Sequence, residues 1–318
     1  MKYLLPWHYQ NYQQAINIIN NNNPSILLYG TSGIGKRLLA QEIINYLLCT
    51  NPQNNLSACN QCHSCTVHNS NNHQDIYTIT TEEGNVKLDI IKYHLSNSLI
   101  TTPKIATKKI VYIPYFEQIT LAGANALLKT LEEPITNLVF IIVTDNITSV
   151  IPTILSRCIK LKITSPSTEE ANQFLQKNTS NVDFNNFWFN YFGQAPIFSP
   201  TLDEEQLELI TSCLLKPSIS NIFKTSAEFD GKKISFSVFI DFFYKWISYL
   251  MQRKTSQTDD GIFHKYDQQL NQILSKMNIE KMFNLQDDLM VFNGFLQHPL
   301  NFKLQIENIL FKYQQCFQ

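Results

Sequence analysis

The chain has 318 residues, of which 44% are hydrophobic and 16% charged, so it can bury a substantial core and form two or three domains. Its 25 basic and 26 acidic side chains give a formal net charge of −1, which argues against nucleic-acid binding through overall positive charge. The first residues lack a signal-peptide pattern and no apolar run reaches the length of a membrane span. We therefore expect a cytoplasmic protein whose seven cysteines are reduced.

Apolar strands alternate with helices in the first half of the chain. The expected strands are 26–29, 76–79, 109–113, 138–143 and 159–162. The expected helices are 9–19, 38–48, 86–99 and 122–133, the last ending at Pro134. Continuous apolar strands between helices indicate a parallel sheet that is covered on both faces, and so an α/β fold.

The second half shows helical periodicity and no convincing strand. The expected helices are 169–177, 204–215, 234–251, 265–278, 285–296 and 302–313. The aromatic residues of 234–251 are expected to form a core between helices. A stacking platform for nucleic acid would need interleaved basic residues, and Lys245 is nearly alone there.

A glycine-rich loop, Gly30-Thr31-Ser32-Gly33-Ile34-Gly35-Lys36-Arg37, follows the first expected strand and leads into a helix. This is the pattern of a phosphate-binding P-loop, in which Gly30, Gly33 and Gly35 let backbone N–H groups surround phosphates and Lys36 lies at the β- and γ-phosphates. The last position should carry a hydroxyl that ligates Mg²⁺, but it is Arg37.

A second departure lies after the expected strand 109–113. A P-loop ATPase needs carboxylates there to hold Mg²⁺ and to position water, but Pro114 and Tyr115 occupy these positions and only Glu117 follows. We treat the two departures as chemically independent, and together they predict that hydrolysis is absent. Weak nucleotide binding through Lys36 stays open.

Four cysteines follow the P-loop helix with the spacing C-x9-C-x2-C-x2-C: Cys49, Cys59, Cys62 and Cys65. Thiolates this close in sequence can converge on Zn²⁺, and four of them would make a closed structural site. The alternatives are that the four thiols merely coincide, or that a nearby histidine replaces one ligand. The candidate histidines are His63, His68 and His73.

Two further motifs resemble a known family. The run Gly123-Ala124-Asn125-Ala126-Leu127-Leu128-Lys129-Thr130-Leu131-Glu132-Glu133-Pro134 resembles the signature of bacterial clamp-loader subunits, the AAA+ family of DNA polymerase III. Thr153-Ile154-Leu155-Ser156-Arg157-Cys158 resembles that family's Ser-Arg-Cys motif, and the four-cysteine insertion also fits. Leu5-Pro6-Trp7 and the degraded ATP site resemble its delta-prime branch, whereas the gamma/tau branch keeps an intact site.

The resemblance implies a role for Arg157. In this family the Ser-Arg-Cys arginine is an arginine finger, given in trans to the ATP of a neighbouring subunit, where a planar guanidinium can stabilise charge on the γ-phosphoryl group. The alternative is an arginine at a strand edge in a surface ion pair. The family's first sensor position corresponds to Thr144, and no sensor arginine is present in the segment 193–198.

We therefore predict a P-loop AAA+ domain at 1–164 with a zinc insertion at about 49–65, a helical lid at 165–200 and a helical collar for oligomerisation at 201–318. The resemblance implies a non-hydrolysing, delta-prime-like subunit of the DNA polymerase III clamp loader. Its partners would be gamma/tau and delta subunits and, through the complex, the sliding clamp and primed DNA. The alternatives are a gamma/tau-type ATPase motor, a stand-alone P-loop NTPase and an accessory DNA-binding module.

Overall fold

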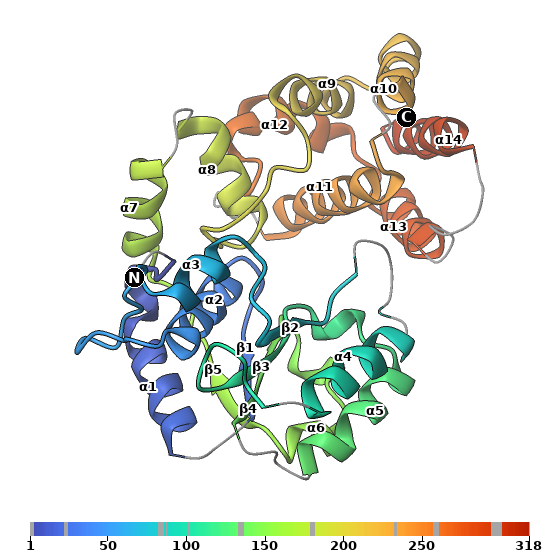
Figure 1. The fold of residues 1–318 in the computed structure, drawn as a ribbon. Coiled ribbons are helices and arrows are strands. Elements are labelled where there is room, and N and C mark those ends of the chain that lie inside the picture. Colours follow the sequence, from blue (N-terminus) through green and yellow to red (C-terminus); the bar gives the residue numbers. More distant parts are fainter. Residues whose placement is uncertain are drawn as a thin grey trace. The chain divides into compact units, whose positions relative to one another are not determined.

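The computed structural model describes residues 3–21, 25–81, 86, 88–100, 102–132, 137–178, 182–231, 234–256, 261–293 and 301–317. By its internal contacts the chain divides into two units (Figure 1). Unit 1 comprises Met1–Thr179 with Gln194–Ile197, and unit 2 comprises Ser180–Gly193 with Phe198–Gln318. The predicted division into a P-loop domain, a lid and a collar stays a prediction.

Unit 1 contains a parallel five-stranded sheet, which confirms the predicted α/β fold. The strands are β1 (Ser25–Tyr29), β2 (Ile76–Thr78), β3 (Lys109–Ile113), β4 (Leu138–Thr144) and β5 (Ile159–Lys162). Their order is β2-β3-β4-β1-β5, and each strand matches an expected one to within a residue or so. β1 lies between β4 and β5, so the loop after β1 lies beside the chain that leaves β4. Ligands of such sheets bind at these carboxyl ends.

Helices cover both faces of this sheet, because successive side chains of its central strands point to opposite faces. Ile26 and Leu28 belong to the core that the sheet shares with α1 (Tyr9–Asn20) and α2 (Lys36–Leu48). Leu27 belongs to the core on the other face. That face packs against α4 (Leu88–Ile100), α5 (Leu121–Glu132) and α6 (Pro152–Leu155), and the two groups of helices are visible in Figure 1.

The described part of unit 1 also contains four short elements. These are the 3-10 turns η1 (Pro6–His8), η2 (Phe116–Gln118) and η3 (Ile147–Ser149), and the helix α3 (His63–Asn69), which was not predicted. α7 (Thr168–Asn178) begins at a capping box, in which Ser167 and Glu170 exchange side-chain and backbone hydrogen bonds. Glu133 and Pro134, where the expected end of α5 falls, lie outside the described residues.

The described residues of unit 2 form helices joined by loops, with no strand among them. Its elements are α8 (Val182–Tyr191), α9 (Glu204–Leu215), α10 (Ile219–Gly231), α11 (Phe236–Ser256), η4 (His264–Tyr266), α12 (Asp267–Lys276), α13 (Ile279–Asn293) and α14 (Phe302–Gln315). α8 and α10 were not predicted. Both are rich in Asn, Ser, Thr or aromatic residues, whose intrinsic helix propensity is low. Part of the expected helix 285–296 falls on residues outside the described ones.

The aromatic side chains of α11 lie in the core of unit 2, as predicted. The buried aromatic residues of this helix are Phe236, Phe239, Phe242, Phe243, Trp246 and Tyr249, whereas Tyr244 is exposed. The indole N–H of Trp246 donates to the hydroxyl of Tyr313 at 2.9 Å, and that hydroxyl donates to the carbonyl of Leu214 at 3.0 Å. This buried chain of hydrogen bonds joins α11, α14 and α9. In the described part of the chain, no helix combines the length and apolar character needed to cross a bilayer.

Candidate functional site

The P-loop lies between β1 and α2 and has the backbone shape that its glycines predict. Gly33 and Gly35 have φ values of +74° and +88°, in the left-handed region that favours glycine. A Cβ on Gly35 would lie 2.4 Å from Leu5 Cδ1, and one on Gly33 would lie 2.7 Å from the Cβ of Ala195. Both glycines are therefore required by conformation and by close packing.

Lys36 is 2% exposed, and oxygen atoms of the protein itself surround its ammonium group. Nζ donates to the carbonyls of Gly30 at 2.8 Å and Thr31 at 2.5 Å, and it lies 2.6 Å from Oδ1 of Asp145. Burial lowers the pKa of Lys36, and the hydrogen bond and charge of Asp145 oppose that shift. The side chain that would meet phosphates is instead bound to its own loop and to one carboxylate.

The side chain of Arg37 crosses the carboxyl ends of the strands and contacts Pro114 and Tyr115, which replace the expected carboxylates after β3. Its Nε donates to the carbonyl of Pro114 at 3.1 Å, and its guanidinium carbon lies 4.0 Å from the centre of the Tyr115 ring. Its Nη2 also lies 3.0 Å from Oδ2 of Asp145. The prediction that the two departures are independent is therefore wrong: the residue that replaces one metal-handling group contacts the residues that replace the others.

Asp145 was missed by the sequence analysis. It directly follows β4, and the strand order places the end of β4 beside the P-loop. Partial burial would raise the pKa of Asp145, but the hydrogen bond and charge of Lys36, followed by Arg37, hold the pKa below its usual value. A carboxylate after the strand next to β1 was the signal that could have revealed it.

Glu117, the remaining carboxylate after β3, is engaged in holding the loop after β4. Its Oε1 accepts hydrogen bonds from the Thr144 hydroxyl and the Asp145 N–H, both at 2.5 Å, and from the Asn146 N–H at 3.1 Å. Thr144, the predicted first sensor position, is thus bound to protein. Glu117 fixes the backbone that carries Asp145.

The outer side of the P-loop is covered by two segments of unit 1. The indole N–H of Trp7 donates to the carbonyl of Ile34 at 3.0 Å, and the N–H of Ile197 donates to the carbonyl of Gly33 at 2.8 Å. His8 is fully buried beside Gly35, and burial lowers its pKa to about 4. Part of the segment 193–198, in which no sensor arginine is present, therefore packs directly on the loop.

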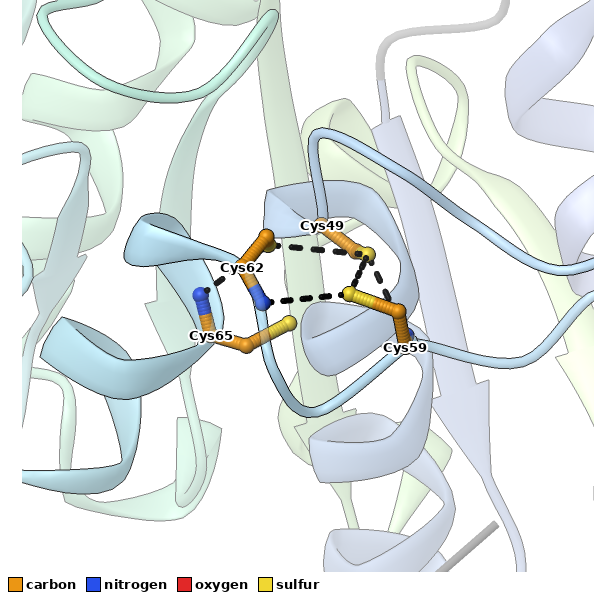
Figure 2. Close-up of side chains that lie close together, drawn as sticks. All are labelled: Cys49, Cys59, Cys62 and Cys65. Carbon is orange, nitrogen blue, oxygen red and sulfur yellow. Dashed lines mark hydrogen bonds between the residues drawn. The ribbon is translucent and has the colours of Figure 1, made fainter.

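The four cysteines come together at the end of α2 and the start of α3, as Figure 2 shows. All their sulfur atoms lie within 4.8 Å of one another. Cys49 Sγ lies 3.5 Å from that of Cys59 and 4.0 Å from that of Cys62. A tetrahedral zinc with bonds of about 2.3 Å would separate its thiolates by about 3.8 Å, so the donor set and its size fit this metal. The cluster could hold a metal ion.

Backbone geometry prepares this cluster for negatively charged sulfur. Three backbone N–H groups donate to cysteine sulfurs: Cys59 to Cys49 at 3.3 Å, Cys62 to Cys59 at 3.3 Å, and Cys65 to Cys62 at 3.5 Å. Asn60 makes the required turn with φ at +57°, which asparagine tolerates better than most residues. Burial would raise the pKa of Cys62, but hydrogen bonds from Thr50 and Cys65 outweigh it and lower the pKa to about 5.

One of the alternative histidine ligands is committed elsewhere. His73 is buried, with Nε2 2.7 Å from the hydroxyl of Ser64 and Nδ1 accepting the N–H of Asp75 at 3.1 Å. Among the described residues, the metal-ligating cluster consists of the four cysteines alone. All seven cysteines of the chain are free.

Arg157 lies after α6, on a different part of unit 1 from the P-loop and the cysteines. Its Nη1 donates to the carbonyl of Thr153 at 2.7 Å and to the hydroxyl of Ser156 at 3.3 Å, while Nη2 pairs with Glu132 at the end of α5. Its side chain is 31% exposed and that of Glu132 is 50% exposed. The surface ion pair considered as the alternative for Arg157 is therefore present, and it joins the two family-like motifs.

With this geometry described, comparison with known proteins gives the family. A model of the family "DNA polymerase III, delta subunit" matches residues 7–167, half of the chain. The chain belongs to this family. The match covers the P-loop, the cysteine cluster and Arg157, and it confirms the resemblance to DNA polymerase III subunits that the motifs indicated.

Individual relatives carry related names. "DNA polymerase III subunit delta'" of Buchnera aphidicola subsp. Baizongia pistaciae (strain Bp) is 30% identical over 188 residues, which are 57% of this chain and 56% of the relative. "DNA polymerase III subunit gamma" of Buchnera aphidicola subsp. Schizaphis graminum (strain Sg) is 31% identical over 185 residues, 58% of this chain and 46% of the relative. The chain thus spans about half the length of the curated relatives it matches.

A solved structure of a DNA polymerase III gamma subunit-related protein from Thermotoga maritima is also similar. It is 19% identical, the match covers 96% of this chain and 99% of that one, and the TM-score is 0.46. That score is too low for an argument about function.

Proposed function

We propose that this chain is a non-hydrolysing, delta-prime-like subunit of a DNA polymerase III clamp loader. It would support ATP-driven loading of a sliding clamp onto primed DNA while turning over no ATP itself. Its partners would be gamma/tau and delta subunits, and it would meet the clamp and DNA through the complex. Membership of the family and the name of the delta-prime relative support this assignment.

The observation that carries the proposal is the set of contacts made by Arg37. A P-loop ATPase holds Mg²⁺ with a hydroxyl at this position and with carboxylates after a later strand. Here the guanidinium of Arg37 replaces the hydroxyl. It also contacts the carbonyl of Pro114 and the ring of Tyr115, the two residues that replace the carboxylates. Glu117 is bound to Thr144 and to two backbone N–H groups. Every group that should handle the metal is replaced or engaged.

Arg157 is proposed as the arginine finger for ATP on a neighbouring subunit. It lies on unit 1 with its guanidinium partly exposed, and its fork of donors suits a phosphoryl group. The four cysteines are proposed to hold a structural zinc ion, because four thiolates leave no open coordination position for catalysis. The lid at 165–200 and the collar at 201–318 are proposed on the family resemblance.

The test is ATP turnover by the purified chain, alone and mixed with motor subunits from the same organism. The chain alone should show none, and Arg157→Ala should slow the neighbouring site that it serves by about 10³-fold. Arg157→Lys should be nearly as slow, because lysine keeps the charge but loses the planar fork. Lys160→Ala, an exposed position on β5, serves as the control and should match wild type.

A gamma/tau-type motor is the competing assignment, favoured by the similarity to a gamma subunit. It requires turnover by the chain alone that Lys36→Ala abolishes. That result would overturn the proposal. Full activity of the mixture with Arg157→Ala would reject the finger.

A further inference from the structure

We propose that Asp145 is the residue that excludes nucleotide from this P-loop. Its carboxylate takes the place of a nucleotide's phosphates on Lys36 and pairs with Arg37, which stands where a metal ligand would be expected. The inference deepens the proposed function and rests on it only for the expectation that the chain turns over no ATP.

The first argument is a count of donors on Lys36. An ammonium group has three N–H donors. Three protein oxygens surround this one: the carbonyls of Gly30 and Thr31 and the carboxylate of Asp145. The two carbonyls belong to the loop itself, so among these three partners Asp145 supplies the negative charge. A phosphate that bound Lys36 would have to displace Asp145, because the Lys36 side chain is buried and its ammonium group lies against these three oxygens.

The second argument is the division of the Asp145 carboxylate between two cations. Oδ1 lies 2.6 Å from Lys36 Nζ, and Oδ2 lies 3.0 Å from Arg37 Nη2. One carboxylate therefore balances much of the charge that a P-loop would otherwise present to phosphates. Arg37 keeps two further anchors, the carbonyl of Pro114 and the ring of Tyr115, so it does not depend on Asp145 for its position.

The third argument is that Asp145 is held in place before any ligand arrives. Glu117 accepts the backbone N–H groups of Asp145 and Asn146 and the hydroxyl of Thr144. The backbone that carries Asp145 is therefore fixed, so its carboxylate meets Lys36 with a smaller loss of conformational freedom than a carboxylate on a mobile loop would. A nucleotide would have to compete with this internal anion. The chain also lacks the metal ligands that would help a nucleotide to bind.

The experiment measures binding of a fluorescent ADP analogue, and of ATP by calorimetry, to the full-length chain. Asp145→Asn keeps the side chain's size but removes its charge, and we expect it to bind nucleotide at least about tenfold more tightly than wild type. Adding Lys36→Ala to that variant should abolish the gain. EDTA should leave the gain unchanged, because Arg37 remains as the counter-cation.

The matched control is Asp288→Asn, which removes the partner of Lys312 in unit 2 and should leave nucleotide binding as in wild type. Thermal unfolding establishes that each variant is folded. Should Asp145→Asn not fold, the double variant Arg37→Gln/Asp145→Asn keeps the formal charge of the wild-type group and should also bind more tightly than wild type.

Three results would overturn the inference. These are wild-type binding as tight as that of a folded Asp145 variant, a gain that survives Lys36→Ala, and a gain that requires Mg²⁺. None of them depends on Arg157 or on motor subunits, so the inference and the proposed function can fail separately.

Discussion

Arg37 is one of three arginines in the chain, and it joins features that lie far apart in the sequence. Its side chain contacts the backbone of Pro114, the ring of Tyr115 and the carboxylate of Asp145. Spacing along the chain identified two of these positions as departures from a nucleotide site. Their contact depends on strand order, because β3, β4 and β1 are adjacent in the sheet.

Glu117 is expected to contribute to stability through the three donors on Oε1. Glu117→Ala removes the charged acceptor of two backbone N–H groups and of the Thr144 hydroxyl, which can still donate to the carbonyl of Asn146. Hydrogen bonds to charged groups are worth about 1.5–3 kcal/mol. The free energy of unfolding, measured by urea denaturation, should fall by about that amount. Glu208→Ala, an exposed position on α9, should change it little, and an equal loss in both variants would contradict this assignment.

His8 predicts an acid sensitivity of unit 1. Its pKa is lowered from 6.5 to about 4, chiefly by burial, so the unfolded chain binds the proton more readily. The contribution of neutral, buried His8 to the free energy of unfolding is fully present above pH 6.5 and is lost as the pH falls towards 4. The loss is up to about 3 kcal/mol. His8→Gln should flatten the pH dependence of the denaturation midpoint between pH 4 and 6.5. His264→Gln, at an exposed position, should leave the slope unchanged.

At the scale of elements, the short helix α3 was missed although the cysteines it helps to place were recognised. Its seven residues are polar and hold little apolar periodicity, so the sequence suggested an irregular segment. Cys62 is the N-cap residue that precedes α3, and its sulfur accepts the N–H of Cys65. The spacing of the cysteines revealed the ligand set, whereas the helix follows from how those ligands are arranged.

Removal of a bound metal should destabilise unit 1. We expect one zinc ion per chain in the purified protein, and Cys62→Ser should lose it while Cys213→Ser, outside the cluster, should retain it. Chelation should lower the midpoint of thermal unfolding, by roughly 2–4 °C for each kcal/mol lost in a domain of this size. A metal content that is unchanged in Cys62→Ser would contradict the site.

The ends of α5 and α6 are joined by Glu132 and Arg157. In the mixture with motor subunits, a finger has to leave this carboxylate. Because exposed ion pairs are worth about 0.2–1 kcal/mol, Glu132→Gln should raise turnover by at most about fivefold. A loss as large as that of Arg157→Ala would mean instead that Glu132 positions the finger. Glu169→Gln, on α7, is the control.

At the scale of the whole molecule, the fold could be predicted better in unit 1 than in unit 2. Buried parallel strands are short, continuous and apolar, so all five were located from the sequence. α8 and α10 could not be found, because their polar or aromatic residues give weak periodicity and they are helical through packing. The residues matched by the family model, 7–167, also fall within unit 1.

Unit 2 depends on its aromatic core, and the hydrogen-bonded pair of Trp246 and Tyr313 offers a test of that core. Trp246→Phe removes the donor to the Tyr313 hydroxyl and part of a fully buried ring system. The combined loss should lower the free energy of unfolding by about 1–3 kcal/mol. Intrinsic fluorescence and circular dichroism in urea would measure it, and nucleotide binding by the Asp145 variant should be unaffected.

The ion pairs of Asp145 with Lys36 and Arg37 also have a consequence for the response of the chain to changing ATP and ADP concentrations. Switching NTPases change shape because the γ-phosphate and its metal order loops that relax after hydrolysis. Here the chain supplies both the anion and the second cation, so neither ATP nor ADP is needed to keep the loop folded. The surface around the loop would be the same at high and at low ATP concentration. A neighbouring ATPase of the proposed complex would then contact the same surface at every step of its cycle.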